Sequence, residues 1–397
     1  MVMPDFTPTQ TASRPNPAPS APNPPLLWDV FCRVIDHHGD LGVCWRLACH
    51  LAARGQRVRL WVDKPDDLQW MAPSGPALVS VHPWPAPADH WPTCTGPTRT
   101  VSTDRKHPTA DMPHRVIEAF GCHLPDGVQA ALARMPAPPV WINLEYLSAE
   151  PHVSRLHGLP SPVMSGPASG LQKWFFYPGF TAHTGGLLHP TAPGPTDPPS
   201  SAFSSPPATA LRVLLFCYEP ASLPAWLDAW ADGGARVDLS VCAGRASPAV
   251  AAWQCHRGAA GSGALHIRYL PWVSQAAFDD LLAQHDLNLV RGEDSLVRAI
   301  WAGKPLVWQI YPQSDGVHHA KLAAFLHSMN APPGVVQAHL AWNADTAQAP
   351  PTWDAQTLRT AGEWVRATRQ CLLAQPDLAQ QLIDFALRHS SPAGAQR

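Results

Sequence analysis

The chain has 397 residues, of which 46 are proline, 45% are hydrophobic and 15% are charged. The hydrophobic fraction is large enough for buried cores and excludes global disorder, which requires low hydrophobicity and high net charge. A formal net charge of −2 excludes a nucleic-acid binder that acts through a broad basic surface. The length indicates two domains of ordinary size.

The prolines cluster in three regions, Met1–Pro25, Met71–Pro113 and Pro190–Pro207. Proline lacks a backbone N–H and clashes with the preceding turn, so such stretches form neither helix interiors nor central strands. We interpret the first region as a disordered extension, the second as a long surface insertion and the third as an interdomain linker.

We expect neither a signal peptide nor a membrane-spanning segment. The N-terminus lacks a charged and then apolar leader, and no window approaches about 18 consecutive apolar residues. Nine cysteines without a CxxC motif indicate reduced thiols in a cytoplasmic protein. The histidine pairs His37–His38 and His318–His319 are adjacent, a spacing that does not place two ligands on one helix face, so we expect no metal.

Apolar periodicity predicts an α/β first half. A strand over Leu26–Val34 leads through a loop to a helix over Val43–Arg54 and a strand over Val58–Val62. Strand, helix and strand within about 35 residues form a βαβ unit, which implies a parallel sheet covered by helices. The pattern continues with strands at Val116–Phe120 and Val140–Leu144 and an apolar segment at Trp174–Tyr177.

The alternation of predicted strands and helices begins again after the linker. A helix over Pro248–Cys255 is expected to have Ser247 as its N-cap and proline at its first position. Two α/β halves place a cleft between two sheets, with the carboxyl ends of the strands facing it. The other predicted strands are Leu211–Cys217, Val237–Cys242, Leu265–Leu270, Asp286–Val290 and Pro305–Ile310, and the other predicted helices are Ser222–Ala231, Gln275–Gln284, Ser295–Trp301, Val317–Ser328, Ala355–Leu373 and Pro376–His389.

These elements define the expected domain organisation. After the extension at residues 1–25, we expect a first Rossmann-like domain at 26–189 and a linker at 190–208. A second Rossmann-like domain is expected at 209–375, and the helix and tail at 376–397 are expected to pack across the two halves.

The loop after the first strand carries two carboxylates, Asp36 and Asp40, among the glycines Gly39 and Gly42. It lies where open α/β sheets bind ligands, but it is not a GxGxxG fingerprint, and its negative charge would repel a pyrophosphate. Two carboxylates four residues apart can converge on a cation or a hydroxyl. The structural alternative is that Asp40 caps the next helix and Asp36 forms an Asx-turn.

A second candidate site is the segment from Arg291 to Ser295, between a predicted buried strand and the start of a helix. The backbone N–H groups and dipole of such a helix start suit a phosphate, and Gly292 allows close approach. Arg291 and Ser295 add a positive charge and a hydroxyl, whereas Glu293 is expected to accept hydrogen bonds from sugar hydroxyls. The alternative is an ordinary capped helix start with solvated Glu293 and Asp294.

Aromatic side chains at strand ends accompany these loops. Phe216 and Tyr218 end the first strand of the second half, and Trp272 and Gln275 follow a later strand. Trp272 is suited to stack on a base and Gln275 to bind its edge, although lone aromatics at strand ends are more often part of a core. The glycine-rich segment Tyr177–Leu187 either lines the cleft or merely turns the chain.

Six segments together carry a resemblance to a known family. They are FCRVIDHHGDLGVCWRLACHLAARGQRVRLWVD, INLEYLSAE, HGLPS, FYPGFTAHTGGLL, LLFCYE and DLNLVRGEDSLVRAIWAGKPLVWQIYPQ, in this order over most of Leu26–Phe325. The sequence resembles the elongation factor P arginine rhamnosyltransferase family in these motifs. The resemblance implies the GT-B fold, with two facing Rossmann-like domains, and inverting transfer of L-rhamnose from dTDP-β-L-rhamnose to one arginine of elongation factor P.

The resemblance also implies roles for individual residues. Asp40 matches the general base and Asp36 its partner in orienting the acceptor guanidinium, while Glu293 matches an essential glutamate. Two positions depart from the family pattern: Trp272 stands in place of a phenylalanine, and His37–His38 replaces an asparagine-aromatic pair. The implied donor-binding residues are Phe216, Tyr218, Trp272, Gln275, Arg291, Gly292, Asp294 and Ser295.

The chemistry of the acceptor accounts for paired carboxylates. Arginine has a pKa above about 12, so two carboxylates hold its guanidinium in a fixed fork before one accepts a proton as the C–N bond forms. Backbone amides and Arg291 can stabilise the departing dTDP, so no metal cofactor is expected. The expected partners are elongation factor P and a nucleotide sugar, without nucleic acid or membrane. The alternatives are another two-domain sugar-nucleotide enzyme, such as a different transferase or a non-hydrolysing epimerase, and a non-catalytic module that docks a translation factor.

Overall fold

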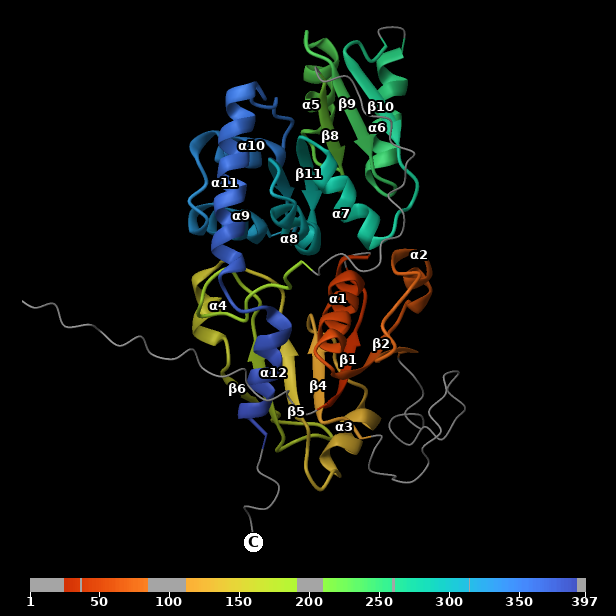
Figure 1. Cartoon of the computed structure of the whole chain (residues 1–397), viewed down its shortest axis with the longest axis vertical. Helices are drawn as coiled ribbons and strands as arrows, with labels where there is room; N and C mark the ends of the chain where they lie inside the picture. Colours follow the sequence, from red (N-terminus) through yellow and green to blue (C-terminus); the bar gives the residue numbers. More distant parts are fainter. Residues whose placement is uncertain are drawn as a thin grey trace, which may run out of the picture.

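The computed structural model describes residues 25–35, 38–84, 112–190, 210–258, 261–313 and 315–390. These residues form two α/β domains, stacked one above the other in Figure 1. The predicted extension, most of the predicted linker, and residues 85–111 of the predicted insertion lie outside the described residues.

The first domain is built on a sheet of strand order β3-β2-β1-β4-β5-β7-β6 in the described residues. All neighbouring strands are parallel except β6 and β7, which are antiparallel. The first six positions of the sheet, β3-β2-β1-β4-β5-β7, have the strand order of a Rossmann-like domain. The strands are β1 (Leu27–Cys32), β2 (Arg57–Val62), β3 (Val79–Pro83), β4 (Arg115–Ala119), β5 (Val140–Leu144), β6 (Pro160–Pro162) and β7 (Gln172–Phe176).

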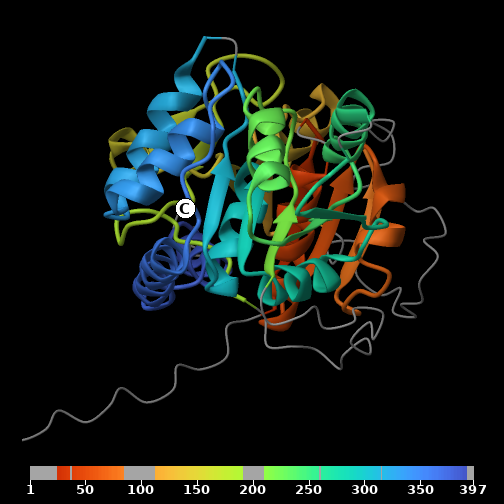
Figure 2. The same ribbon diagram turned by 90° about the horizontal axis from the view of Figure 1, so that it is seen from above.

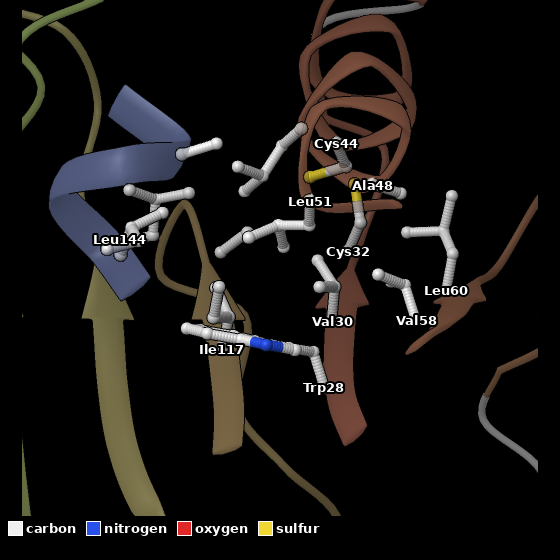
Figure 3. Packing of buried hydrophobic residues seen from close by; sticks show 14 of the residues in the cluster. Trp28, Val30, Cys32, Cys44, Ala48, Leu51, Val58, Leu60, Ile117 and Leu144 are labelled. Carbon is white, nitrogen blue, oxygen red and sulfur yellow. The ribbon is translucent and has the colours of Figure 1, made fainter. Parts of the chain in front are cut away.

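The central strand β1 is buried along its whole length because helices or loops cover both faces of the sheet. Its alternate residues Trp28, Val30 and Cys32 belong to one core; Cys32 lies beside Cys44 of α1, and the ring of Trp28 extends to Ile117 (Figure 3). Phe31 belongs to a separate core on the opposite face. The helices of this domain are α1 (Gly39–Ala53), the 3₁₀ turn η1 (Pro65–Asp67), α2 (Leu68–Met71), α3 (Asp126–Ala133), α4 (Pro151–Leu156) and α12 (Leu378–Arg388).

The second domain has a five-stranded parallel sheet of order β10-β9-β8-β11-β12 among the described residues. Seen from above, helices lie on both sides of its strands (Figure 2). Its strands are β8 (Leu211–Leu215), β9 (Val237–Val241), β10 (Leu265–Tyr269), β11 (Leu287–Arg291) and β12 (Leu306–Gln309). Its helices are α5 (Leu223–Asp232), α6 (Ala246–Arg257), α7 (Gln275–Gln284), α8 (Gly292–Ala302), α9 (Val317–Ser328), α10 (Pro333–Trp342) and α11 (Ala355–Leu373).

Each domain has its own sheet, and the two domains lie one above the other, which confirms the predicted GT-B architecture (Figure 1). The C-terminal helices connect the halves: α11 contributes Trp364 and Val365 to the core of the second domain, whereas α12 contributes Leu382 and Ile383 to that of the first. No helix within the described ranges is both long and apolar enough to span a membrane.

Two helices begin earlier than the sequence predicted, and both starts lie at the cleft. Helix α1 begins at Gly39 instead of Val43, which places Asp40 in its first turn, where the helix dipole favours a carboxylate. Helix α8 begins at Gly292 instead of Ser295. Gly292 has a φ of 64°, a conformation that favours glycine, so the chain passes from β11 straight into the helix.

Other local predictions were wrong for identifiable reasons. Helix α6 begins at Ala246, so Ser247 is not its N-cap, and the Ser247 hydroxyl instead donates to the carbonyl of Cys242 at 3.0 Å. Proline is tolerated throughout a first helical turn, where N–H groups have no intrahelical partner. The predicted insertion contains the edge strand β3, and the short helices α3, α4 and α10 were not predicted.

Candidate functional site

Two adjoining cavities lie at the carboxyl ends of the strands, between the two domains. The first cavity encloses about 100 Å³ and is lined mainly by the second domain, including Phe216, Trp272, Gln275 and Arg291. The second encloses about 360 Å³ and is lined by both domains, including Asp40. Gly39 of α1 and Gly292, Glu293 and Asp294 of α8 line both cavities, so the first turns of these two helices separate them.

Asp40 lies at the second cavity with its side chain almost entirely buried. Its Oδ2 accepts a hydrogen bond from the backbone N–H of Ile35 at 2.8 Å, which closes the loop between β1 and α1. The structural alternative, in which Asp40 caps the next helix, is wrong: Asp40 is the second residue of α1, and its carboxylate instead holds the preceding loop while it lines the cavity. Asp36 lies outside the described residues.

Glu293 connects the two domains. Its Oε2 accepts the backbone N–H of Leu147, which follows β5 in the first domain, at 2.8 Å. Its Oε1 pairs with the ammonium of Lys321 from α9. Each oxygen retains a second lone pair that can accept a hydroxyl group from a ligand.

Asp294 also contacts both domains. Its Oδ1 lies 2.5 Å from Nη1 of Arg46 in α1, and its Oδ2 lies 3.4 Å from Nη1 of Arg298. Arg298 is itself held by Asp279, with Nε 2.7 Å from Oδ1. Because both oxygens of its carboxylate contact arginine side chains, Asp294 acts by positioning these groups at the site.

Arg291 ends β11 directly at the first cavity. Its guanidinium lies 4.6 Å from the ring centroids of both Phe216 and Tyr218, a cation–π arrangement that fixes its direction. Nη1 of Arg291 is buried without a hydrogen-bond partner in the described part of the chain. An unpartnered buried donor is costly, so this group is suited to bind an anion.

The other predicted donor-binding residues near Arg291 make mainly structural contacts. The Ser295 hydroxyl donates to the carbonyl of Arg291 and accepts its N–H at 3.1 Å. The structural alternative, a capped helix start with solvated Glu293 and Asp294, is wrong, because no side chain of the described residues caps α8 and both carboxylates are paired. Tyr218 is buried behind Arg291 and is absent from the linings of both cavities. Gly292 contributes its carbonyl to the indole N–H of Trp308 at 2.7 Å.

Trp272, on the loop between β10 and α7, and Gln275, the first residue of α7, flank the first cavity. Trp272 is 53% exposed, and Ser274 caps α7 by accepting the N–H of Ala277 at 3.3 Å. The Nε2 of Gln275 is buried without a hydrogen-bond partner among the described residues. A Cβ on Gly42 would lie 2.8 Å from this atom, so only glycine allows α1 to approach Gln275 this closely.

The second cavity contains functional candidates that the sequence did not reveal. Phe120 and Tyr146 stack with their ring centroids 4.9 Å apart and their planes at 24°. Phe120 has a φ of 57°, a strained conformation for a residue with a bulky side chain. Arg46 and Lys321 were also missed, although Arg46 lies three residues after Val43, which lines the same cavity, and the helical repeat could have indicated it.

One group of possible metal ligands occurs among the described residues, formed by His318, His319 and Asp345, with their ligand atoms within 4.8 Å of one another. Nδ1 of His318 accepts the backbone N–H of Gln313 at 3.2 Å, which leaves the proton of the neutral ring on Nε2. None of the three lines either cavity.

The cysteines near the site are structural. The eight described cysteines form no disulfide. Burial raises the pKa of Cys242 to about 12, partly offset by the positive charge of Arg291, so its thiol stays protonated at neutral pH. This agrees with the expectation of reduced thiols.

Comparison with known proteins gives a consistent assignment. The family model described as Elongation-Factor P (EF-P) rhamnosyltransferase EarP matches residues 28–387. A protein-arginine rhamnosyltransferase of Pseudomonas putida KT2440 is 39% identical over 394 residues, covering 90% of this chain and 98% of the relative. The enzyme of the same name from Pseudomonas aeruginosa PAO1 is 37% identical over 385 residues, with the same coverage.

A solved structure agrees with the sequence comparisons. It is described as the structural basis for EarP-mediated arginine glycosylation of translation elongation factor EF-P. It covers 92% of this chain and 99% of its own, with a TM-score of 0.54 and 27% sequence identity. Since the family model spans nearly all described residues and the relatives exceed 30% identity over nine-tenths of the chain, this chain belongs to the EF-P rhamnosyltransferase family EarP.

Proposed function

We propose that this chain transfers L-rhamnose from dTDP-β-L-rhamnose to an arginine of elongation factor P, with inversion at the anomeric carbon. The observation that carries the proposal is the meeting of the two cavities at the first turns of α1 and α8. An anion-binding group, Arg291, lies on one side of this junction, and a buried carboxylate, Asp40, lies on the other. An in-line displacement at the anomeric carbon requires this arrangement, with the diphosphate leaving group on one side of the sugar and the cationic nucleophile on the other.

The first cavity is suited to the nucleotide part of the donor. The free Nη1 of Arg291 and the N-terminal backbone amides of α8 are donors for the diphosphate. The free Nε2 of Gln275 is available to an acceptor on the base or ribose, and Trp272 provides an aromatic face for the base. Glu293 lies between the cavities, where its remaining lone pairs can accept rhamnose hydroxyls.

The second cavity is suited to the acceptor arginine. A guanidinium is planar and cationic, so it stacks favourably on aromatic rings and forms charge-assisted bonds with carboxylates. The stacked rings of Phe120 and Tyr146 supply the aromatic wall and Asp40 supplies the carboxylate. We also retain Asp36, which lies outside the described residues, as the proposed second carboxylate.

The proposed reaction is a single displacement. A guanidinium nitrogen forms a bond to the anomeric carbon while the bond from that carbon to the β-phosphate oxygen breaks. Asp40 accepts the proton of the attacking nitrogen as the C–N bond forms, because the nitrogen becomes more acidic at that stage. Arg291 and the α8 amides stabilise the negative charge on departing dTDP, so the proposal includes no metal cofactor.

The acceptor and the nucleotide-sugar donor place the proposed reaction in the cytoplasm. The test is intact-mass analysis of elongation factor P co-expressed with this chain and with a source of dTDP-rhamnose. The proposal expects the added mass of one deoxyhexose, which disappears when the acceptor arginine is replaced by lysine or when this chain carries Asp40→Asn. An unmodified factor, or a modification that persists after the arginine is replaced, contradicts the proposal.

Donor identity is tested separately by calorimetry with purified protein. The proposal expects dTDP to bind more tightly than UDP. Equal or tighter binding of UDP would indicate a different sugar nucleotide, which is the main alternative enzyme activity.

A further inference from the structure

Three aromatic side chains from two domains meet at the first cavity. Trp70 of α2 and His38, immediately before α1, come from the first domain, and Trp272 comes from the second. The ring centroids of Trp70 and Trp272 are 4.9 Å apart, and that of His38 lies 5.0 Å from Trp70 and 5.4 Å from Trp272. All three line the first cavity, and we call them the aromatic bridge.

The half of the bridge that belongs to the first domain is firmly held. Helix α2 is a single turn, anchored by the buried side chains of Leu68 and Met71. Nδ1 of His38 lies 3.3 Å from Oδ2 of Asp67, the residue before α2. Trp70 also packs on the core of the first domain, so it cannot move far without moving the domain.

The first cavity is too small for a nucleotide in this structure. Its volume of about 100 Å³ is below the range of about 300–1,000 Å³ that pockets for small molecules and cofactors have. The second cavity, at about 360 Å³, is within that range. A nucleoside diphosphate therefore requires the first cavity to widen, and the bridge is a contact between the two domains in its lining.

We infer that Trp70 and His38 belong to the nucleotide-binding site: they separate from Trp272 to admit a nucleoside diphosphate and then pack on the bound nucleotide. The inference rests on the proposed function only in taking the first cavity as the nucleotide site. It assigns a nucleotide-binding role to the first domain, whereas the donor-binding residues that the family resemblance implies all belong to the second. A ring in contact with the ligand contributes a factor of about three to ten in affinity.

The test is stopped-flow measurement of dTDP association and dissociation with the full chain and the variant Trp70→Leu. Removal of the ring opens the entrance and removes a contact, so both rate constants should rise, with dissociation rising more and dTDP binding three- to tenfold more weakly. Trp70→Phe retains an aromatic ring and should stay within about twofold of the wild-type rates. Leu78→Ala, at an exposed position of the same domain outside both cavity linings, is the control and should leave the rates unchanged.

A purely structural contact would give a different result. It would lower the unfolding temperature of Trp70→Leu and leave dTDP dissociation unchanged, which would overturn the inference. A double-mutant cycle with Trp272→Leu adds a second criterion, because side chains that act on the same ligand give non-additive changes in dTDP affinity. Additive changes would overturn the inference as well.

The experiment separates this inference from the proposed donor. UDP is measured in parallel with dTDP on the same variants. If UDP binds as tightly as dTDP and Trp70→Leu accelerates its dissociation, the proposed donor is wrong and the role of Trp70 stands. If dTDP is preferred and Trp70→Leu leaves both rate constants unchanged, the role of Trp70 is wrong and the donor stands.

Discussion

Arg46 of α1 and Asp294 of α8 form an ion pair across the cleft, with Nη1 of the arginine 2.5 Å from Oδ1 of the aspartate. Their side chains are only 14% and 12% exposed, so water and salt screen the pair weakly. The pair lies between the first turn of α8, which lines both cavities, and the domain that contains Asp40. It therefore couples the approach of the two domains to the geometry of the site.

Replacing Arg46 by glutamine should weaken both the fold and the closed cleft. Among the described residues Asp294 would keep only Arg298, at 3.4 Å, and the loss of a charge-assisted hydrogen bond at this mostly buried site should cost about 1–3 kcal/mol in the free energy of unfolding. The KM for the donor should rise, because the ion pair no longer holds the two domains in the relative position that forms the site. Urea unfolding and initial rates measure these effects. Arg257→Gln, which breaks a surface pair with Asp228, is the control and should leave the KM unchanged.

Asp40→Asn should abolish transfer while it preserves the fold. The asparagine carbonyl can still accept the N–H of Ile35, but it cannot accept the proton of the acceptor arginine. The rate of transfer should fall by a factor of about 100 or more, with unchanged dTDP affinity by calorimetry. The exposed Asp66→Asn is the matched control and should retain wild-type activity. Wild-type turnover by Asp40→Asn with normal dTDP affinity would rule out Asp40 as the base.

Lys321→Met should show whether Glu293 depends on its cationic partner. Without the ammonium, Oε1 of Glu293 loses a charge-assisted hydrogen bond, and the carboxylate is held only by Leu147. Such bonds contribute about 1.5–3 kcal/mol, so we expect kcat/KM for the donor to fall by about ten- to hundredfold. Lys321→Arg keeps the charge and should recover most of the activity. Equal activity of the methionine and wild-type proteins would show that Lys321 has no part in positioning Glu293.

His339 should make the stability of the fold depend on pH. It is fully buried, and burial lowers its pKa to about 4, with a hydrogen bond to the carbonyl of Val335 acting in the opposite direction. In the unfolded chain the pKa is about 6.5, so between about pH 6.5 and 4 the unfolded state binds the proton more readily. Stability should therefore fall as the pH decreases through this window, by about 3 kcal/mol from this residue.

The measurement is urea unfolding at several pH values from about 7 to 4, for wild type and His339→Leu. The leucine variant should lose less stability than wild type as the pH falls, because its side chain does not titrate. His256→Leu, at an exposed position, should follow the wild-type pH dependence. Parallel curves for wild type and His339→Leu would contradict the assignment.

The local elements were largely predictable, because each strand and helix carries its own apolar repeat. The helix over Gln275–Gln284 and the strand over Val140–Leu144 were predicted with the bounds that the structure shows. The start of α8 was not, because Gly292 enters the helix with a positive φ that no apolar pattern reveals. This difference matters at the site, since it places Glu293 and Asp294 inside the first helical turn.

The partners of the site residues were not predictable, because they are distant in sequence. The N–H group bound by Glu293 belongs to Leu147, 146 residues earlier, and the arginine that pairs with Asp294 is 248 residues earlier. Trp70 immediately precedes the predicted surface insertion Met71–Pro113, and no motif or predicted element included it. Only the packing of the domains shows that it contacts Trp272.

The sequence by itself determined the two α/β halves, the loops that face the cleft and the family, because strand and helix periodicity and short motifs are properties of neighbouring residues. It also showed that the excess of proline lies outside the loops that carry the motifs. Only the tertiary structure decided which groups meet: Glu293 with Leu147 and Lys321, Arg46 with Asp294, and the rings of the aromatic bridge. The reason is physical: these contacts form when two separately built sheets approach each other, and their geometry depends on the packing of both domains.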